Sequence, residues 1–349
     1  MNTAYSNSRR SAGFSLIEML VAMLIGLIIM SGVMQIYVST RDTQRGSEDQ
    51  LEMLGNARFA IEAIAYDLRH SNVWGRHNNG ALVQCQNTAA TSAIPCSGTP
   101  MPPATGDCAD QEYINIERPV FAGDNSNPYT GTCATESYKA GTDILTVRYA
   151  DTNRLKTDKL SANVAYLRTS LSGGMLFVSS GSSVPDAPMI PGWKDDTLSS
   201  NHLLVSRAYY VSDYSDTPGD GLPSLRRSDL LAGPEMVSDV LLTGVEDFQL
   251  EFGVDIGTNG VRGERDGQVD SYVKASSVSN WALDVLAVRI WVLMRSEHTD
   301  RSDIGSSQTF TIAGNPVTTP NDGYRRYLVS GVVKLRNTTQ KNVSTAGGG

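Results

Sequence analysis

Residues 9–38 read RRSAGFSLIEMLVAMLIGLIIMSGVMQIYV, and this stretch decides how the fold begins. Two arginines precede an almost uncharged run, which is interrupted by a single carboxylate, Glu18. About 25 apolar residues, at a helical rise of about 1.5 Å each, are long enough to span the core of a bilayer. Arginine in a short flanking segment favours a cytoplasmic N-terminus. The sequence therefore predicts a transmembrane helix over 14–38, with the rest of the chain exported.

The apolar run is too long for the core of a cleaved secretory signal. Ser31 and Gly32 imitate the small residues that precede a signal-peptidase site, but the run continues through Tyr37 and Val38. A plain membrane anchor is the simplest alternative.

Glu18 argues against a plain anchor. An ionisable group inside a membrane helix costs about 2.5–3.5 kcal/mol and marks a functional site whose partner has to be found. The partner that fits a carboxylate at this depth is an amine. Cleavage after Gly13 would create one on Phe14, one helical turn from Glu18.

The segment Gly13-Phe14-Ser15-Leu16-Ile17-Glu18 resembles the class III signal of type IV pilins and type II secretion pseudopilins. The resemblance implies that residues 1–13 are a leader, which a prepilin peptidase removes by cutting between Gly13 and Phe14. It also implies that Phe14 is then N-methylated and that Glu18 guides the subunit into a growing filament.

The helix is expected to continue over 39–70, because the chain contains no proline before Pro95. A mainly apolar stripe recurs there at steps of three and four residues, which is typical of an amphipathic helix. The stripe consists of Leu51, Leu54, Arg58, Ile61, Ala65 and Leu68, with Phe59 and Ile64 beside it. We expect it to pack on the protein's own globular domain, and Ser71, Asn72 and Gly75 to end the helix.

Four cysteines lie within the loop-rich segment 76–142: Cys85, Cys96, Cys108 and Cys133. An even number of cysteines in an exported chain indicates disulfides. Of the three pairings, the shorter loops favour Cys85–Cys96 and Cys108–Cys133. Zinc is the weaker alternative, because no Cys-x-x-Cys pair is present.

From Asp143 onward, alternating apolar and β-branched residues predict strands. The expected strands are 144–149, 175–178, 202–211, 241–252, 283–294 and 327–335. The last two are the most apolar and are expected to be central in an antiparallel sheet. The predicted class is α+β: a long N-terminal helix on an antiparallel β domain (71–337) that contains a disulfide-bonded insertion, with a flexible tail over 338–349.

This order of elements resembles the PilW-type minor pilins and the related J-type pseudopilins. Residues 57–62 (ARFAIE), 67–69 with the pair Trp74-Gly75, and 287–295 (AVRIWVLMR) followed by 326–329 carry the resemblance. It implies a minor pilin that helps to prime and cap type IV pilus assembly within a tip complex. The implied location is the inner membrane, with the C-terminal domain in the periplasm, and then the pilus tip.

The partners that the resemblance implies are other minor pilins, the major pilin, a large tip adhesin, the prepilin peptidase and the inner-membrane assembly platform. Two alternatives stay open. One is a J-type minor pseudopilin of a type II secretion system, and the other is a membrane-anchored periplasmic binding module outside any filament. The formal charge of −8, which becomes −10 without the two leader arginines, disfavours nucleic acid as a partner of this subunit.

The sequence contains no catalytic motif and predicts no enzyme. The four histidines (His70, His77, His202 and His298) lack metalloprotease spacing, and neither a nucleophile elbow nor a phosphate-binding loop is present.

Residues 255–270 (DIGTNGVRGERDGQVD) form one candidate cation loop. The candidate calcium ligands are Asp255, Asn259, Asp266 and Asp270. The first three fall at ligand positions of an EF-hand-like loop. However, Gly257 supplies no side-chain ligand at the third position, and the positive charges of Arg262 and Arg265 would repel a bound cation. The alternative is the tip of a hairpin between strands 245–254 and 271–274, where Asp, Asn and Gly supply turn geometry.

Replacing Gly13 by Leu is expected to leave the leader attached, because glycine lets the backbone enter a protease cleft closely. Mass spectrometry should find N-methylated Phe14 at the start of the wild-type chain and an intact leader on Gly13→Leu. Gly26→Leu, which changes a glycine inside the anchor, is the matched control and should be cleaved normally. A wild-type chain that keeps Met1 in cells with active peptidase would contradict the pilin interpretation.

Overall fold

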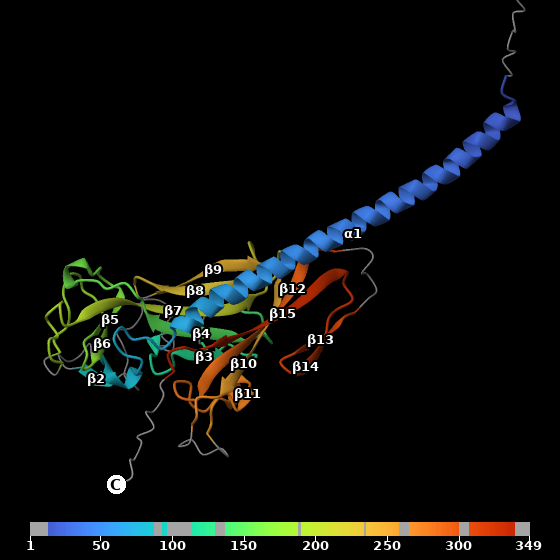
Figure 1. Cartoon of the computed structure of the whole chain (residues 1–349). Coiled ribbons are helices and arrows are strands. Elements are labelled where there is room, and N and C mark those ends of the chain that lie inside the picture. The colour runs from blue at the N-terminus through green and yellow to red at the C-terminus, as the bar shows by residue number, and fades with distance from the viewer. Residues whose placement is uncertain are drawn as a thin grey trace, which may run out of the picture. The chain divides into compact units, whose positions relative to one another are not determined.

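The computed structural model describes residues 13–86, 93–95, 114–129, 137–187, 190–233, 235–257, 265–299 and 307–338. It comprises two units, Met1–Glu52 and Met53–Gly349. Helix α1 (Leu16–His70) occupies most of the first unit and continues into the second (Figure 1). Of the helices in the described ranges, α1 alone is long and apolar enough to cross a membrane, and its most apolar window is not buried by protein. The predicted helix and its extension are therefore confirmed as one element.

The second unit contains two main sheets in its described part (Figure 1). The larger sheet runs β2-β1-β6-β5-β7-β4-β3, and β8 and β9 extend it from β7. Its strands are β1 (Val83–Gln86), β2 (Ala93–Pro95), β3 (Val120–Gly123), β4 (Ile144–Ala150), β5 (Ala165–Thr169), β6 (Gly174–Val178), β7 (Ser200–Ser212), β8 (Ser224–Leu231) and β9 (Glu235–Thr243). All of its pairings are antiparallel except that of β1 with β6.

The smaller sheet runs β11-β10-β12-β15 and is antiparallel throughout. Its strands are β10 (Val245–Val254), β11 (Ser271–Val273), β12 (Val285–Thr299) and β15 (Tyr324–Lys334). A separate hairpin joins β13 (Thr309–Ile312) to β14 (Asn315–Thr318), and short 3-10 turns lie at Gly80–Leu82, Thr157–Lys159 and Ala275–Ser277. The predicted α+β class is thus confirmed.

One face of the last turns of α1 shares a hydrophobic core with both sheets. The buried helix residues are Met53, Ala57, Ala60, Ile64, Ala65 and Leu68. The predicted stripe is correct at Ile64, Ala65 and Leu68 but wrong at Leu51, Arg58 and Phe59, which are exposed. The buried face includes two alanines, whose small side chains allow close packing. At Gly331 of β15 a Cβ atom would lie 2.9 Å from a methyl group of Ile61 on the helix, so a larger residue there would force the Ile61 side chain to move.

All six predicted strands are present, with two corrections. The segment 241–252 is not one strand, because Gly244 breaks it with a φ of 77° between the end of β9 and the start of β10. A Cβ at Gly244 would also lie 2.8 Å from the carbonyl oxygen of Arg295. The second correction concerns β15, which pairs with β12 alone among the described strands and therefore lies at an edge of the sheet.

Asp67 links helix α1 to the larger sheet through hydrogen bonds. Its side chain is fully buried, and its Oδ1 accepts hydrogen bonds from the hydroxyl of Tyr149 on β4 (2.8 Å) and from Nη1 of Arg207 on β7 (2.7 Å). Oδ2 accepts a third from the hydroxyl of Tyr209, also on β7 (2.5 Å). Burial, followed by the negative charge of Asp67, raises the pKa of both tyrosines. Both phenols therefore stay protonated and act as donors.

Hydrogen bonds link the C-terminal end of α1 to the segment just after β15. Asn337, just after β15, donates from its side-chain amide to the carbonyl oxygens of Arg69 (3.0 Å) and Ser71 (3.2 Å). In return, the side-chain amide of Asn72 donates to the carbonyl oxygen of Asn337 (2.6 Å). Asn72 has a φ of 62°, the left-handed conformation that commonly ends helices. Its place confirms the predicted end of the helix.

Asp143 joins the two sheets at the start of β4. Its backbone N–H donates to the carbonyl oxygen of Phe248 on β10 (2.8 Å). Its carboxylate accepts the N–H groups of Leu250 on β10 (2.7 Å) and of Asn125 in the turn after β3 (2.8 Å). Burial raises the pKa of Asp143 to about 7, although both N–H donors favour the charged form. The joint between the sheets is therefore sensitive to pH.

The raised pKa of Asp143 determines the direction in which the free energy of unfolding changes with pH. Between about pH 4 and about pH 7 the folded protein keeps this proton and the unfolded chain releases it, so the free energy of unfolding falls as pH rises. The fall contributed by Asp143 is up to about 4 kcal/mol. Urea titrations of the soluble chain from residue 42 should show a shallower pH dependence in Asp143→Asn. Asp239→Asn, at an exposed site on β9, is the control. Parallel pH profiles for wild type and Asp143→Asn would refute the assignment.

Candidate functional site

The first turn of α1 fixes the position of Glu18. Ser15 precedes the helix, and its backbone N–H donates to Oε2 of Glu18 at 2.9 Å. The N–H of Met19 donates to the carbonyl oxygen of Ser15 at 3.1 Å, which closes the turn. A Ser at the N-cap with a Glu three residues later is the pattern of a capping box, and the Glu half of the box is formed here. The carboxylate is thus held at the helix N-terminus, where the helix dipole favours negative charge.

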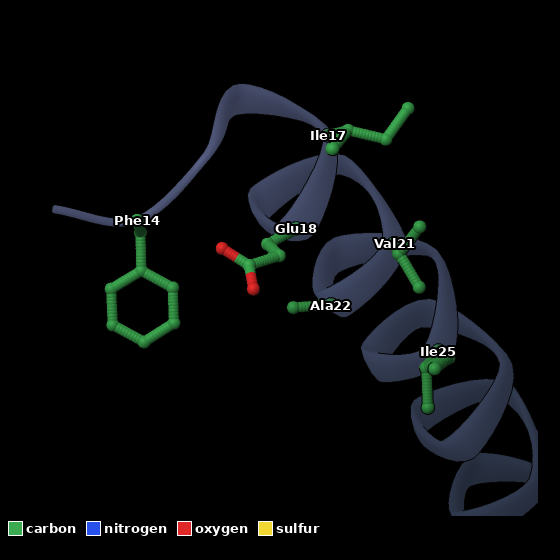
Figure 2. A pocket seen from close by; sticks show the side chains of 6 residues that line it. All are labelled: Phe14, Ile17, Glu18, Val21, Ala22 and Ile25. Carbon is green, nitrogen blue, oxygen red and sulfur yellow. The ribbon is translucent and has the colours of Figure 1, made fainter. Parts of the chain in front are cut away.

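Glu18 lies in an otherwise apolar hollow on the side of the helix. The hollow is lined by Phe14, Ile17, Glu18, Val21, Ala22 and Ile25. Figure 2 shows the carboxylate directed to the side of the helix on which Phe14 lies, with the small Ala22 beside it. The Phe14 side chain is 90 % exposed. A single carboxylate among apolar walls is suited to an amine carried on an apolar segment.

The structure brings the predicted residues Phe14 and Glu18 into the same hollow. Gly13 precedes Phe14 directly, and a Cβ added there would meet no described atom within 4 Å. Sequence reasoning missed Ser15. The Ser-x-x-Glu spacing of a capping box was the signal that could have identified it.

One of the four cysteines lies in the described part of the chain. Cys85 is buried in β1 and is disulfide-bonded. Cys96, Cys108 and Cys133 lie outside the described residues. The pairing of Cys85 with Cys96 and of Cys108 with Cys133 stays a prediction.

The predicted hairpin around 255–270 is present, since β10 pairs with β11. Asp255 is buried, and its two oxygens accept the N–H groups of Gly257 (3.1 Å) and Gly267 (2.8 Å). Asp270 accepts the N–H of Ile256 at 2.9 Å. Asp266 accepts the N–H of Gln268, and Asn259 lies outside the described residues. Within the described ranges no three His, Cys, Asp or Glu residues gather as metal ligands. Calcium would have to compete with these backbone donors.

Two sequence families match the chain. The family of type IV pilus-assembly protein W matches residues 208–337, which run from within β7 to just beyond β15. The prokaryotic N-terminal methylation motif matches residues 8–34, which include Gly13, Phe14 and Glu18. No curated protein and no solved structure matches the chain.

The calcium hypothesis for the 255–270 loop predicts that millimolar calcium raises the thermal midpoint of the soluble chain and that a chelator reverses the rise, by mass action. Asp266→Ala should abolish the difference, because it removes one candidate ligand. Asp158→Ala, which changes an exposed aspartate elsewhere, should retain it. An unchanged midpoint in calcium would leave the loop as the tip of a hairpin.

Proposed function

We propose that this chain is a PilW-like type IV minor pilin that helps to prime and cap pilus assembly within a tip complex. The observation that carries the proposal is the carboxylate of Glu18 in its apolar hollow, directly after a junction that matches the N-terminal methylation motif. In the assembled state, Glu18 of one subunit would accept the α-amine that cleavage creates on Phe14 of a neighbour.

The physical basis of this pairing is the low dielectric constant of the membrane. Opposite charges a few ångströms apart attract far more strongly there than in water. A carboxylate left alone in the bilayer costs free energy, so a neighbour that supplies an amine is favoured over one that does not. The pairing also fixes how far one helix is displaced along the next, because both groups lie at defined places on their helices.

The proposed location follows from the N-terminal sequence. Arg9 and Arg10 would keep the leader on the cytoplasmic side of the membrane, where the prepilin peptidase would remove it before the inner-membrane assembly platform takes up the mature chain. The domain that follows α1 would lie in the periplasm before assembly and at the pilus tip afterwards. Its partners there would be other minor pilins, the major pilin and a large tip adhesin. The role is structural, and no catalytic step is proposed.

The N-terminal motif alone does not separate a pilus from a secretion pseudopilus, because both kinds of subunit share it. The match of 208–337 to the pilus-assembly family favours the pilus. That match covers all four strands of the smaller sheet, so the preference rests on the exported domain rather than on the anchor.

Glu18→Ala is expected to leave cleavage and membrane insertion intact, because it lies beyond the Gly13–Phe14 bond and removes a costly group from the bilayer. Crosslinking between the anchors of this protein and its partner pilins should fall about tenfold, which corresponds to about 1.4 kcal/mol of lost pairing. Fewer surface pili should accompany the fall.

Ser31→Ala, at one of the few other polar positions of the anchor, is the matched control and should crosslink like wild type. Normal crosslinking and a normal number of pili in Glu18→Ala would show that the exported domain directs assembly without the carboxylate.

A further inference from the structure

We infer that β15 is a docking edge of the smaller sheet, to which a partner protein of the pilus adds an extended segment as a further strand. The segment would carry apolar or small residues in its middle and acidic residues at the end that lies beside Lys334 and Arg336. That the partner is a pilus component rests on the proposed function. The edge itself belongs to the single chain and can be tested with a synthetic peptide.

Every second residue of β15 directs its backbone groups away from β12. The N–H of Leu335 donates to the carbonyl oxygen of Leu286 (2.8 Å), one step beyond the register pair of Ala287 with Lys334. Residues that bond to the partner strand alternate with residues that do not in an antiparallel pair. The residues whose N–H and C=O groups point away from β12 are therefore Leu328, Ser330, Val332 and Lys334. No described strand lies on that side of β15.

The residues along this edge are open to solvent, whereas the other face of the strand is covered. Ser330, Val332 and Lys334 are exposed, and Val332 is 56 % exposed although it is apolar. On the opposite face, Gly331 approaches Ile61 of α1 and Val333 belongs to the core. The helix thus covers one face of β15 and leaves the alternate residues of the outer face accessible.

The β15 edge lacks the features that usually prevent a sheet from pairing with another chain, which are proline, bulges and charge. The strand contains no proline, residues 327–333 (YLVSGVV) carry no charge, and the register with β12 is uninterrupted over 326–334. The edge formed by β9 differs. A register shift interrupts its pairing with β8, and it carries the exposed acids Glu235 and Asp239. Of these two long edges, β15 is the one suited to accept a strand.

The charges at the end of β15 indicate the chemistry of the occupant. Lys334 and Arg336 are exposed, and neither has an acidic partner among the residues that the structure describes. At the other end of the strand, Arg326 is neutralised by Glu246 and Asp322. The chain's own C-terminal segment offers no carboxylate, because 337–349 contains no Asp or Glu. A second copy of β15 would bring the same two cations, so charge complementarity favours an acidic segment of another protein.

Strand addition uses main-chain hydrogen bonds for affinity and side chains for specificity. The first test uses the full-length mature chain in lipid nanodiscs that hold a single copy. Amide hydrogen exchange over 328–334 is followed by mass spectrometry, with a synthetic peptide of alternating Val and Thr that ends in two glutamates as the probe. The peptide should slow exchange in this segment. The same peptide ending in two lysines should bind about tenfold more weakly, because it sets like charges opposite each other.

Three variants test the edge itself. Val332→Pro removes an N–H that points away from β12, so it should leave the smaller sheet intact and abolish the effect of the peptide. Val332→Thr keeps the N–H and the branched side chain and is the matched control, which should behave like wild type. Lys334→Glu combined with Arg336→Glu should reverse the preference between the acidic and the basic peptide.

Two results would overturn the inference. One is exchange that the acidic peptide leaves unchanged in wild type or slows equally in Val332→Pro. The other is slow exchange over 328–334 in the chain alone, which would mean that the edge is already covered.

The second test places a photocrosslinker at position 330 in cells that make pili. Crosslinks to a minor pilin, the major pilin or the tip adhesin, lost in Val332→Pro, would support the inference, and their absence in wild type would overturn it. No peptide binding together with lost anchor crosslinking in Glu18→Ala would overturn the docking edge alone. Peptide binding together with unchanged anchor crosslinking in Glu18→Ala would support the edge and overturn the proposed function.

Discussion

The buried carboxylate of Asp67 is the constraint on which the packing of the second unit depends. A carboxylate placed in a protein core without partners costs several kcal/mol, and removing one partner from a buried pair costs about 3–5 kcal/mol. Asp67 has three donors from β4 and β7. Arg207 in turn binds Asp229 on β8 (2.7 Å), and Asp229 binds Arg227 (2.7 Å). The hydrogen bonds to Asp67 require β4 and β7 to lie in register, and the ion pair of Arg207 with Asp229 adds β8 to the same network.

Much of this fold could be predicted from local patterns, and the exceptions have physical causes. The alternation along β4, β7 and β12 is plain in the sequence, as is the uninterrupted helix. β8 escaped prediction because its middle is polar, and those side chains serve the network around Asp229. The break at Gly244 depends on the close approach of the Arg295 backbone, 51 positions later in the chain, which no local pattern contains. The buried helix face was misplaced in part because alanines are weak signals of burial.

The candidate site could be proposed from the sequence because it is local. Gly13, Phe14 and Glu18 lie within six residues, and the chemistry of a carboxylate in a bilayer follows from the sequence alone. Ser15 was missed because its contribution comes from the backbone N–H rather than from its side chain. The calcium hypothesis for the 255–270 loop shows, by contrast, what the sequence does not reveal. The oxygens of Asp255 and Asp270 are engaged by backbone groups of their own loop, which composition does not reveal.

The hydrogen bonds between Asn337 and the end of α1 join residues that are 265 positions or more apart. A chain synthesised from its N-terminus delivers the end of the helix early and Asn337 more than 260 residues later. The carbonyl groups at the end of the helix therefore gain these donors only after β15 has been made. Contacts between residues this far apart in the sequence slow folding. These hydrogen bonds can form only after Asn337 has been synthesised, so a chain that stops short of it would leave the carbonyl groups of Arg69 and Ser71 without these donors.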